Sequence, residues 1–130
     1  MTTATETGLL RWAPRPRDVV RATGPDAESY LNRMLSNDVA KVPVKGSQDA
    51  LLLTAKARVI APVRLVRRAV DDFLLLTEPG LGAELARTLL RARFAAKVQI
   101  EAEPHEVLVV LAGASGWEPP AKALAAACSD

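Results

Sequence analysis

The sequence predicts an α+β domain in which helices pack on one face of an antiparallel sheet. Apolar residues alternate in some segments and recur at helical spacing in others, in the order strand, helix, three strands, helix, two strands, helix. Short turns join most consecutive strands, which favours antiparallel pairing of a ferredoxin-like kind. With 49% hydrophobic residues, a chain of 130 residues has enough apolar side chains for the core of one domain.

The amino-terminal segment 1–17 is expected to form an extended arm because it is polar and contains two prolines. The core domain is expected to span 18–112. Its first strand is predicted at 18–22, where Val19 and Val20 are β-branched.

A helix is predicted to begin at Pro25, which suits a first helical turn because its missing N–H costs nothing there. One apolar stripe follows at helical spacing and is expected to face the core: Ala27, Tyr30, Leu31, Met34 and Leu35. The run Ser36-Asn37-Asp38 is expected to end the helix, since these side chains compete for backbone hydrogen bonds.

Three strands are predicted next, at 50–54, 59–66 and 73–77. The first two are joined at Lys56-Ala57-Arg58, which lacks the Gly, Asn or Asp usual in tight turns. Pro62 cannot donate to a strand ladder, so we expect an edge or a bulge there.

The carboxyl-terminal part is predicted to contain a helix at 81–93 and strands at 97–101 and 107–112. Residues 113–130 are expected to form a loop and the start of a further helix. We therefore expect this chain to be part of a longer protein.

Composition restricts the functional classes. The chain carries 17 Lys and Arg against 15 Asp and Glu, so its charge is no argument for a nucleic-acid or membrane partner, and we expect neither. Cys128 is the only cysteine, which excludes an intrachain disulfide and favours a reducing compartment. Because no secretory signal or membrane-length apolar run is present, we predict a cytoplasmic protein.

Motifs for catalysis are sparse, and we predict no catalytic or metal-binding residue. The loop 113–116 lacks the lysine of a phosphate-binding P-loop, and His105 is interpreted as a solvated turn residue. The arginines are interpreted as a solvated face in preference to an anion groove.

Four stretches carry a family resemblance: VRATGPDAESYLNRMLSNDVAKV, LLLTAKARVIAPVRLVRR, DDFLLLTEPGLGAELARTLLRARFAAKVQIE and VLVVLAG. Together they resemble the amino-terminal part of the YgfZ-type folate-binding proteins, which are related to the T-protein (aminomethyltransferase) of the glycine cleavage system. Family members typically carry a Gly-x-Asp-Ala helix start, a Thr-x-Asp-Val helix end and a Leu-x-x-x-Lys-Gly-Arg hairpin. This chain has the first motif, Ser36-Asn37-Asp38-Val39 in place of the second, and Ala57 in place of the glycine of the third. The resemblance covers 19–113 in unbroken order.

The resemblance implies a tetrahydrofolate-binding scaffold with a role in iron–sulfur cluster assembly or repair and in tRNA modification, and iron–sulfur proteins as partners. It implies a ligand-facing rim formed by Asn37, Asp38, Lys56 and Arg58. The basic residues of that rim are expected to meet the glutamate carboxylates of folate.

The departures from the family pattern also have implications. The acids of the T-protein fall at Ala61-Pro62, where neither residue can transfer a proton. A tryptophan that holds folate in some YgfZ-type members falls near Arg17, with Trp12 the nearest aromatic residue. The Lys-Gly-Cys-x-x-Gly-Gln-Glu motif of the second half is not in this sequence, and we expect either that half or a second copy, in a homodimer, to complete the scaffold.

Two alternatives to a folate-binding scaffold remain at this point. One is an aminomethyltransferase like the T-protein. The other is an RNA- or protein-binding module that uses the arginine-rich faces.

Overall fold

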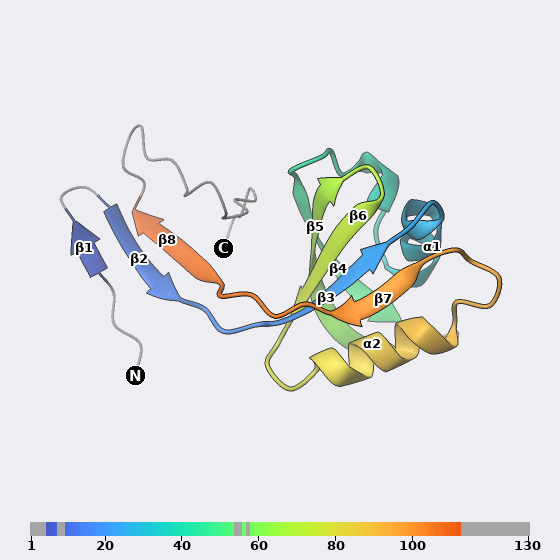
Figure 1. Cartoon of the computed structure of the whole chain (residues 1–130). Coiled ribbons are helices and arrows are strands. Elements are labelled where there is room, and N and C mark those ends of the chain that lie inside the picture. Colours follow the sequence, from blue (N-terminus) through green and yellow to red (C-terminus); the bar gives the residue numbers. More distant parts are fainter. Residues whose placement is uncertain (1–4, 8–9, 54–55, 57, 113–130) are drawn as a thin grey trace.

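The computed structural model describes residues 5–7, 10–53, 56 and 58–112, and it contains two antiparallel sheets (Figure 1). The small sheet has the order β1-β2-β8, and the large sheet has the order β4-β5-β6-β3-β7. The small sheet consists of β1 (Thr5–Thr7), β2 (Leu10–Pro14) and β8 (Leu108–Ala112). The large sheet consists of β3 (Asp18–Thr23), β4 (Ser47–Leu53), β5 (Val59–Ala69), β6 (Asp72–Thr77) and β7 (Gln99–Ala102). The helices are α1 (Ala27–Met34), the short 3₁₀ helix η1 (Val39–Lys41) and α2 (Gly82–Arg91).

The predicted α+β class and the order of elements within 18–112 are confirmed, while the partners of the last two strands differ from expectation. We expected consecutive strands to pair, but β7 pairs with β3 and β8 pairs with β2 in the other sheet. Segment 1–17, predicted as an arm, contains β1 and β2. The loop predicted at 113–116 and the helix predicted after it lie outside the described residues.

Both helices pack on one face of the large sheet, as the apolar stripes predict. The stripe of α1 and Leu85 and Leu89 of α2 share one cluster with alternate residues of the strands, including Val20 and Phe73. The intervening strand residues point to the other face, where Val19, Val66 and Leu74 form a smaller cluster. Tyr30 connects the helices, because its hydroxyl donates a hydrogen bond to the backbone carbonyl of Leu89.

Pro62 lies where β5 has a neighbour on one side only. It pairs with Leu51 of β4, whereas the pairing of β5 with β6 begins at Arg64. A register shift at Leu52/Leu53 also lies close to it. The strand thus tolerates a residue that has no N–H to donate.

The turn before α1 holds the start of β7. Gly24 has φ +134, and a Cβ at this position would lie 2.4 Å from the carbonyl oxygen of Lys97. Asp26 donates its backbone N–H to that carbonyl (3.2 Å), and its carboxylate accepts the N–H of Lys97 (2.7 Å). Ala27 is fully buried directly behind the turn. Gly24, Asp26 and Ala27 are thus each favoured by a different contact of this turn.

A second close approach joins β3 to α2. One carboxylate oxygen of Asp18 accepts the N–H groups of Gly80 (3.0 Å) and Gly82 (2.9 Å) at the start of the helix. A Cβ on Gly82 would lie 2.7 Å from the Cβ of Asp18. The carboxylate also lies at the positive end of the helix dipole, which favours its charge.

Arg67 contradicts the interpretation of the arginines as a solvated face. Its side chain is 9% exposed and lies on the helix side of the sheet, 5.0 Å from the centre of the Phe73 ring. Its guanidinium donates to Glu28 (2.6 Å) and to the carbonyls of Val42 (2.9 Å) and Val70 (2.9 Å). A buried guanidinium needs such partners, and Arg67 obtains them from three separate segments.

Replacing Gly24 with alanine tests the contact between the turn and β7. We expect Gly24→Ala to lower the free energy of unfolding by about 2–4 kcal/mol, because it adds a steric clash to backbone strain. Gly80→Ala is the matched control, since Gly80 also has a positive φ (+94) but a Cβ added there would meet no atom within 4 Å. It should cost only about 1 kcal/mol, the strain alone. Equal losses in urea denaturation of the two variants would contradict the assignment.

Candidate functional site

The principal pocket lies on the face of the large sheet that the helices leave open. Part of its lining comes from two rows, each made of residues that pair across neighbouring strands. Asp49, Arg64 and Leu76 stand side by side in one row, and Leu51 pairs with Pro62 in the next. Thr77 pairs with Asp18. Glu78 directly follows Thr77 and Arg17 directly precedes Asp18, so both residues lie beside the second row. The pocket has a volume of about 490 Å³ and is lined by Arg17, Ser36, Asn37, Asp49, Ala50, Leu51, Pro62, Val63, Arg64 and Glu78.

The charges in the pocket are two guanidinium groups and two carboxylates. Arg64 pairs with Asp49 (3.1 Å), and Glu78 pairs with Arg15 outside the pocket lining (3.7 Å). The Nε atom of Arg17 is buried and has no hydrogen-bond partner among the described residues. The Nε of Arg67 is buried in the same way, so this feature is not particular to Arg17. An anion in the pocket would meet the outer N–H groups of the Arg17 guanidinium.

Of the four residues predicted to form a ligand-facing rim, the structure places Asn37 in the pocket lining. Its amide donates a hydrogen bond to the backbone carbonyl of Asp49 on β4. Asp38 lies next to it, but its carboxylate accepts the N–H of Ala40 (3.1 Å) and caps η1. Lys56 and Arg58 are exposed in the β4–β5 connection and are not among the lining residues.

The turn Lys56-Ala57-Arg58, which lacks the usual Gly, Asn or Asp, is only partly described, because Ala57 lies outside the described residues. Ala61 is buried, whereas Pro62 lines the pocket. The resemblance places acids at positions 61 and 62. Only position 62 lines the pocket, and its proline has no titratable group.

Sequence reasoning missed Arg17, Asp49, Arg64 and Glu78 as pocket residues. Arg17 and Glu78 lie outside the strands, and Asp49 lies in β4 but just before the strand predicted at 50–54. Arg64 occupies an outward-facing position of the strand predicted at 59–66. Cross-strand register alone brings them together, and register is not visible in one unaligned sequence.

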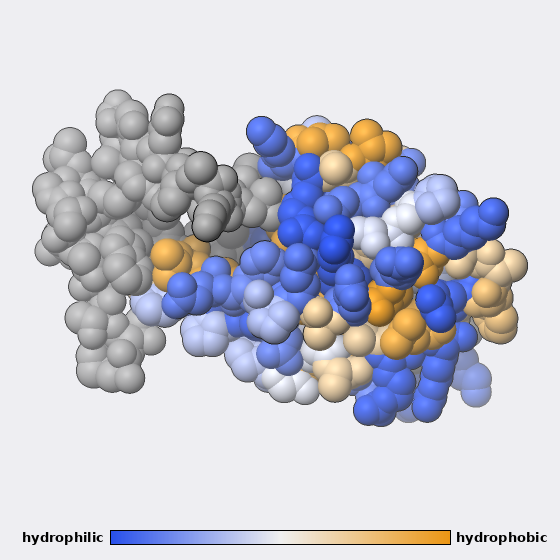
Figure 2. All heavy atoms as spheres, viewed as in Figure 1, coloured by the Kyte–Doolittle hydropathy of each residue, from blue (hydrophilic) through white to orange (hydrophobic). Residues whose placement is uncertain are grey.

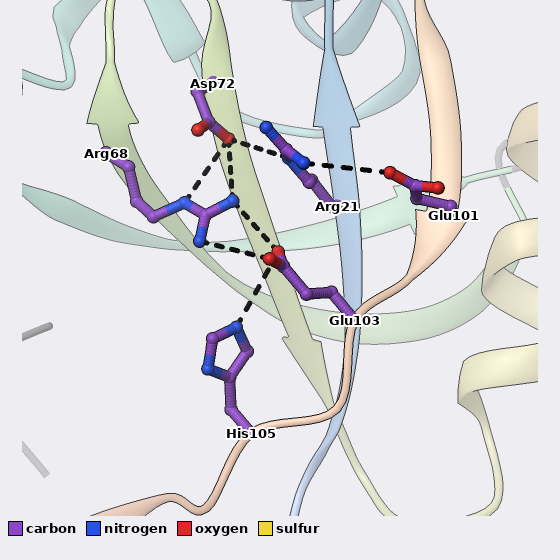
Figure 3. A network of polar contacts seen from close by, with 6 residues as sticks. All are labelled: Arg21, Arg68, Asp72, Glu101, Glu103 and His105. Atoms are coloured by element: carbon purple, nitrogen blue, oxygen red, sulfur yellow. Dashed lines mark hydrogen bonds and ion pairs between the residues drawn. The ribbon is translucent and has the colours of Figure 1, made fainter. Parts of the chain in front are cut away.

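A network of polar side chains occupies the other end of the same open face (Figure 3). Arg68 donates to Asp72 (3.0 Å) and to Glu103 (2.9 Å), and Arg21 lies between Asp72 (3.5 Å) and Glu101 (3.8 Å). Burial disfavours the charged form of Arg68, but hydrogen bonds and attraction from Asp72 and Glu103 outweigh it, so the pKa of Arg68 is raised.

His105 is exposed between β7 and β8, as the interpretation of a solvated residue expects, and its Nε2 lies 3.7 Å from the Glu103 carboxylate at the edge of this network. The backbone supports the same attachment. The N–H of Glu103 donates to Val19 (3.1 Å), and the N–H of Arg15 donates to Val107 (2.8 Å). The network therefore holds the β7–β8 connection on the sheet.

Other kinds of site are not found in the described part of the chain. There, no group of three or more His, Cys, Asp or Glu side chains could hold a metal ion. No helix among those residues is long and apolar enough to cross a membrane.

Comparisons with known proteins identify the fold. No protein-family model matches the chain, and no curated protein sequence matches it. A solved structure, the glycine cleavage system aminomethyltransferase T from Bartonella henselae, matches with a TM-score of 0.66 at 24% sequence identity. The match covers 71% of this chain and 26% of that protein. The chain thus has a T-protein-like fold over about a quarter of that protein's length.

Removing Arg68 tests whether the network holds the β7–β8 connection. In Arg68→Gln, we expect the amides of Glu103 and Arg15 to exchange their hydrogens about tenfold faster or more, since ionic hydrogen bonds contribute roughly 1.5 kcal/mol or more. Arg21→Gln is the matched control, because its contacts are longer, and it should change these two rates less. Unchanged exchange in Arg68→Gln would contradict this role.

Proposed function

We propose that this domain binds tetrahydrofolate in the open-face pocket and belongs to a YgfZ-like protein. The observation that carries the proposal is the composition of the pocket lining. Arg17, Asn37 and Pro62 come from three segments that the resemblance associates with folate, and they lie around one pocket. The T-protein-like fold also supports the proposal of a folate-binding domain.

The pocket suits a ligand with an apolar ring system and carboxylates. Its volume of about 490 Å³ is within the range of small-molecule sites. Arg17 contributes a guanidinium to the pocket lining, and a folate carboxylate would pair with it. Leu51 and Pro62 offer an apolar wall for the ring system. Lys56 and Arg58, which lie outside the lining, would meet only the distal glutamate of a bound folate.

The proposed role is binding without catalysis, in iron–sulfur cluster assembly or repair and in tRNA modification. Iron–sulfur proteins would then be the partners, and the cytoplasm the compartment. A second half of the protein or a second copy of this chain would complete the scaffold. Sedimentation velocity tests the second copy, and a monomer at high concentration would exclude it. Loss of cluster-dependent enzyme activity in cells lacking the protein would support the role, and unchanged activity would contradict it.

The aminomethyltransferase alternative is favoured by the name of the matched structure. Two features of the pocket speak against it. Pro62 cannot accept a proton, and the carboxylates of Asp49 and Glu78 are each paired with an arginine. We therefore expect no transfer of an aminomethyl carbon to tetrahydrofolate in a reconstituted glycine cleavage assay, and turnover would establish the alternative.

The folate proposal is tested by calorimetry with tetrahydrofolate under reducing conditions. We expect the wild-type chain to bind, and Arg17→Gln to bind about tenfold more weakly or worse, because hydrogen bonds to charged groups contribute roughly 1.5–3 kcal/mol. Arg87→Gln is the matched control and should leave affinity unchanged, since Arg87 pairs with Glu84 on the exposed side of α2 (3.1 Å) and does not line the pocket.

Thermal unfolding of each variant shows whether the fold is kept. Absence of heat with the wild-type chain would contradict folate binding by this domain alone. Equal affinity of Arg17→Gln and the wild type would contradict the assigned pocket.

A further inference from the structure

A second surface, on the helix side of the domain, has no role in the proposed folate site. It lies where the α2–β7 connection passes the start of α1, and Phe94 is its most prominent residue. Figure 2 shows hydrophobic residues as small separate patches on a mainly hydrophilic face. Among the large hydrophobic residues described as exposed, Phe94 is the most exposed, at 92%.

The backbone at Phe94 is in an unusual conformation for such a residue. Its φ is 50, and Lys45 is the only other described non-glycine residue with a positive φ. A bulky residue in this conformation is strained, and glycine or asparagine would suit the position better. Neither the strain nor the exposed ring stabilises the domain. Such a residue is a candidate for function.

Hydrogen bonds on both sides of Phe94 hold the backbone that carries it. The N–H of Ala96 donates to Arg93 (2.9 Å), and Arg93 donates from its guanidinium to Val98 (3.1 Å). The next residue, Lys97, is bound to the Asp26 carboxylate (2.7 Å). The connection is therefore anchored at both ends, and Phe94 is presented by ordered backbone, which lowers the entropic cost of binding.

A groove of about 390 Å³ runs beside the ring, between Arg33, Ser29 and Asp26 on one side and Arg93, Phe94 and Ala96 on the other. The two guanidinium groups lie close to one buried phenol. Burial raises the pKa of Tyr30, while the charges of Arg33 and Arg93 oppose that rise. Arg33 lies 5.5 Å from the centre of the Tyr30 ring.

The groove has an excess of positive charge. Within the described residues, no carboxylate forms an ion pair with Arg33. The acid in the groove, Asp26, already accepts the N–H of Lys97. Aromatic and arginine side chains are the residues most enriched at energetically important interface positions.

We propose that this groove binds an acidic segment of a partner protein, with carboxylates on Arg33 and Arg93 and an apolar side chain against Phe94. The charge of the groove selects the acidic segment, and the exposed ring selects its apolar residue. RNA fits less well, because a single aromatic residue offers one stacking position and Asp26 would repel phosphates. The groove shares no lining residue with the folate pocket, so the two proposals stand independently.

The test measures fluorescence anisotropy of a short labelled peptide in which acidic residues alternate with leucine. We expect the full chain to bind it, and Phe94→Asn and Arg33→Gln each to weaken binding about tenfold or more. Arg87→Gln, on the outer side of α2, is the matched control and should bind as the wild type does. A peptide with glutamine and asparagine in place of the acids should bind much more weakly.

Phe94→Asn also separates binding from folding, because asparagine tolerates a positive φ and the variant should unfold at the same or a higher temperature. No binding of the acidic peptide, equal binding of the neutral peptide, or unchanged affinity in Phe94→Asn would each overturn the proposal. Binding of oligouridine in place of the peptide, with a steep salt dependence lost in Phe94→Asn, would overturn it in favour of RNA.

Discussion

The contact between the turn at Gly24–Ala27 and Lys97, just before β7, is the constraint on which the rest of the domain depends. It joins segments about seventy positions apart through two hydrogen bonds and a glycine that leaves room for a carbonyl oxygen. The turn determines where α1 begins, and the hydroxyl of Tyr30 then positions α1 against α2. Asp18 secures the start of α2 in turn. Both helices are thereby held on one face of the sheet.

Because the helices cover one face, the alternate residues of the same strands collect on the other. That face has three zones along the strands: the pocket at one end, a small apolar cluster around Val66 and Leu74, and the network around Arg68 at the far end. The network holds the connection to β8, which leaves the large sheet and pairs with β2. A ligand in the pocket would therefore contact a sheet that the Arg68 network stabilises on the same face and the two helices stabilise on the opposite face.

The arginines show why composition alone misleads. Arg87 is 57% exposed on α2 and behaves as the solvated residue that composition suggests. Arg67 is instead buried among carbonyls, Glu28 and Phe73, and Arg68 is partly buried between two carboxylates. Arg17 and Arg64 line the pocket. The same side chain thus supports the core, holds a connection or lines a site, depending on the strand position it occupies.

The sequence by itself determined the local elements. The stripe from Ala27 to Leu35, the strands around Val20, Leu65 and Leu75, and the turn at Gly24 are all evident from side-chain periodicity and turn chemistry, which act over a few residues. Only the tertiary structure decided that β7 and β8 lie in different sheets, that Asn37 reaches the pocket while Asp38 caps a helix, and that Phe94 is exposed. The reason is physical. Strand pairing, the satisfaction of buried charges and the lining of a pocket depend on which distant segments meet, and a single sequence does not encode that register in any local pattern.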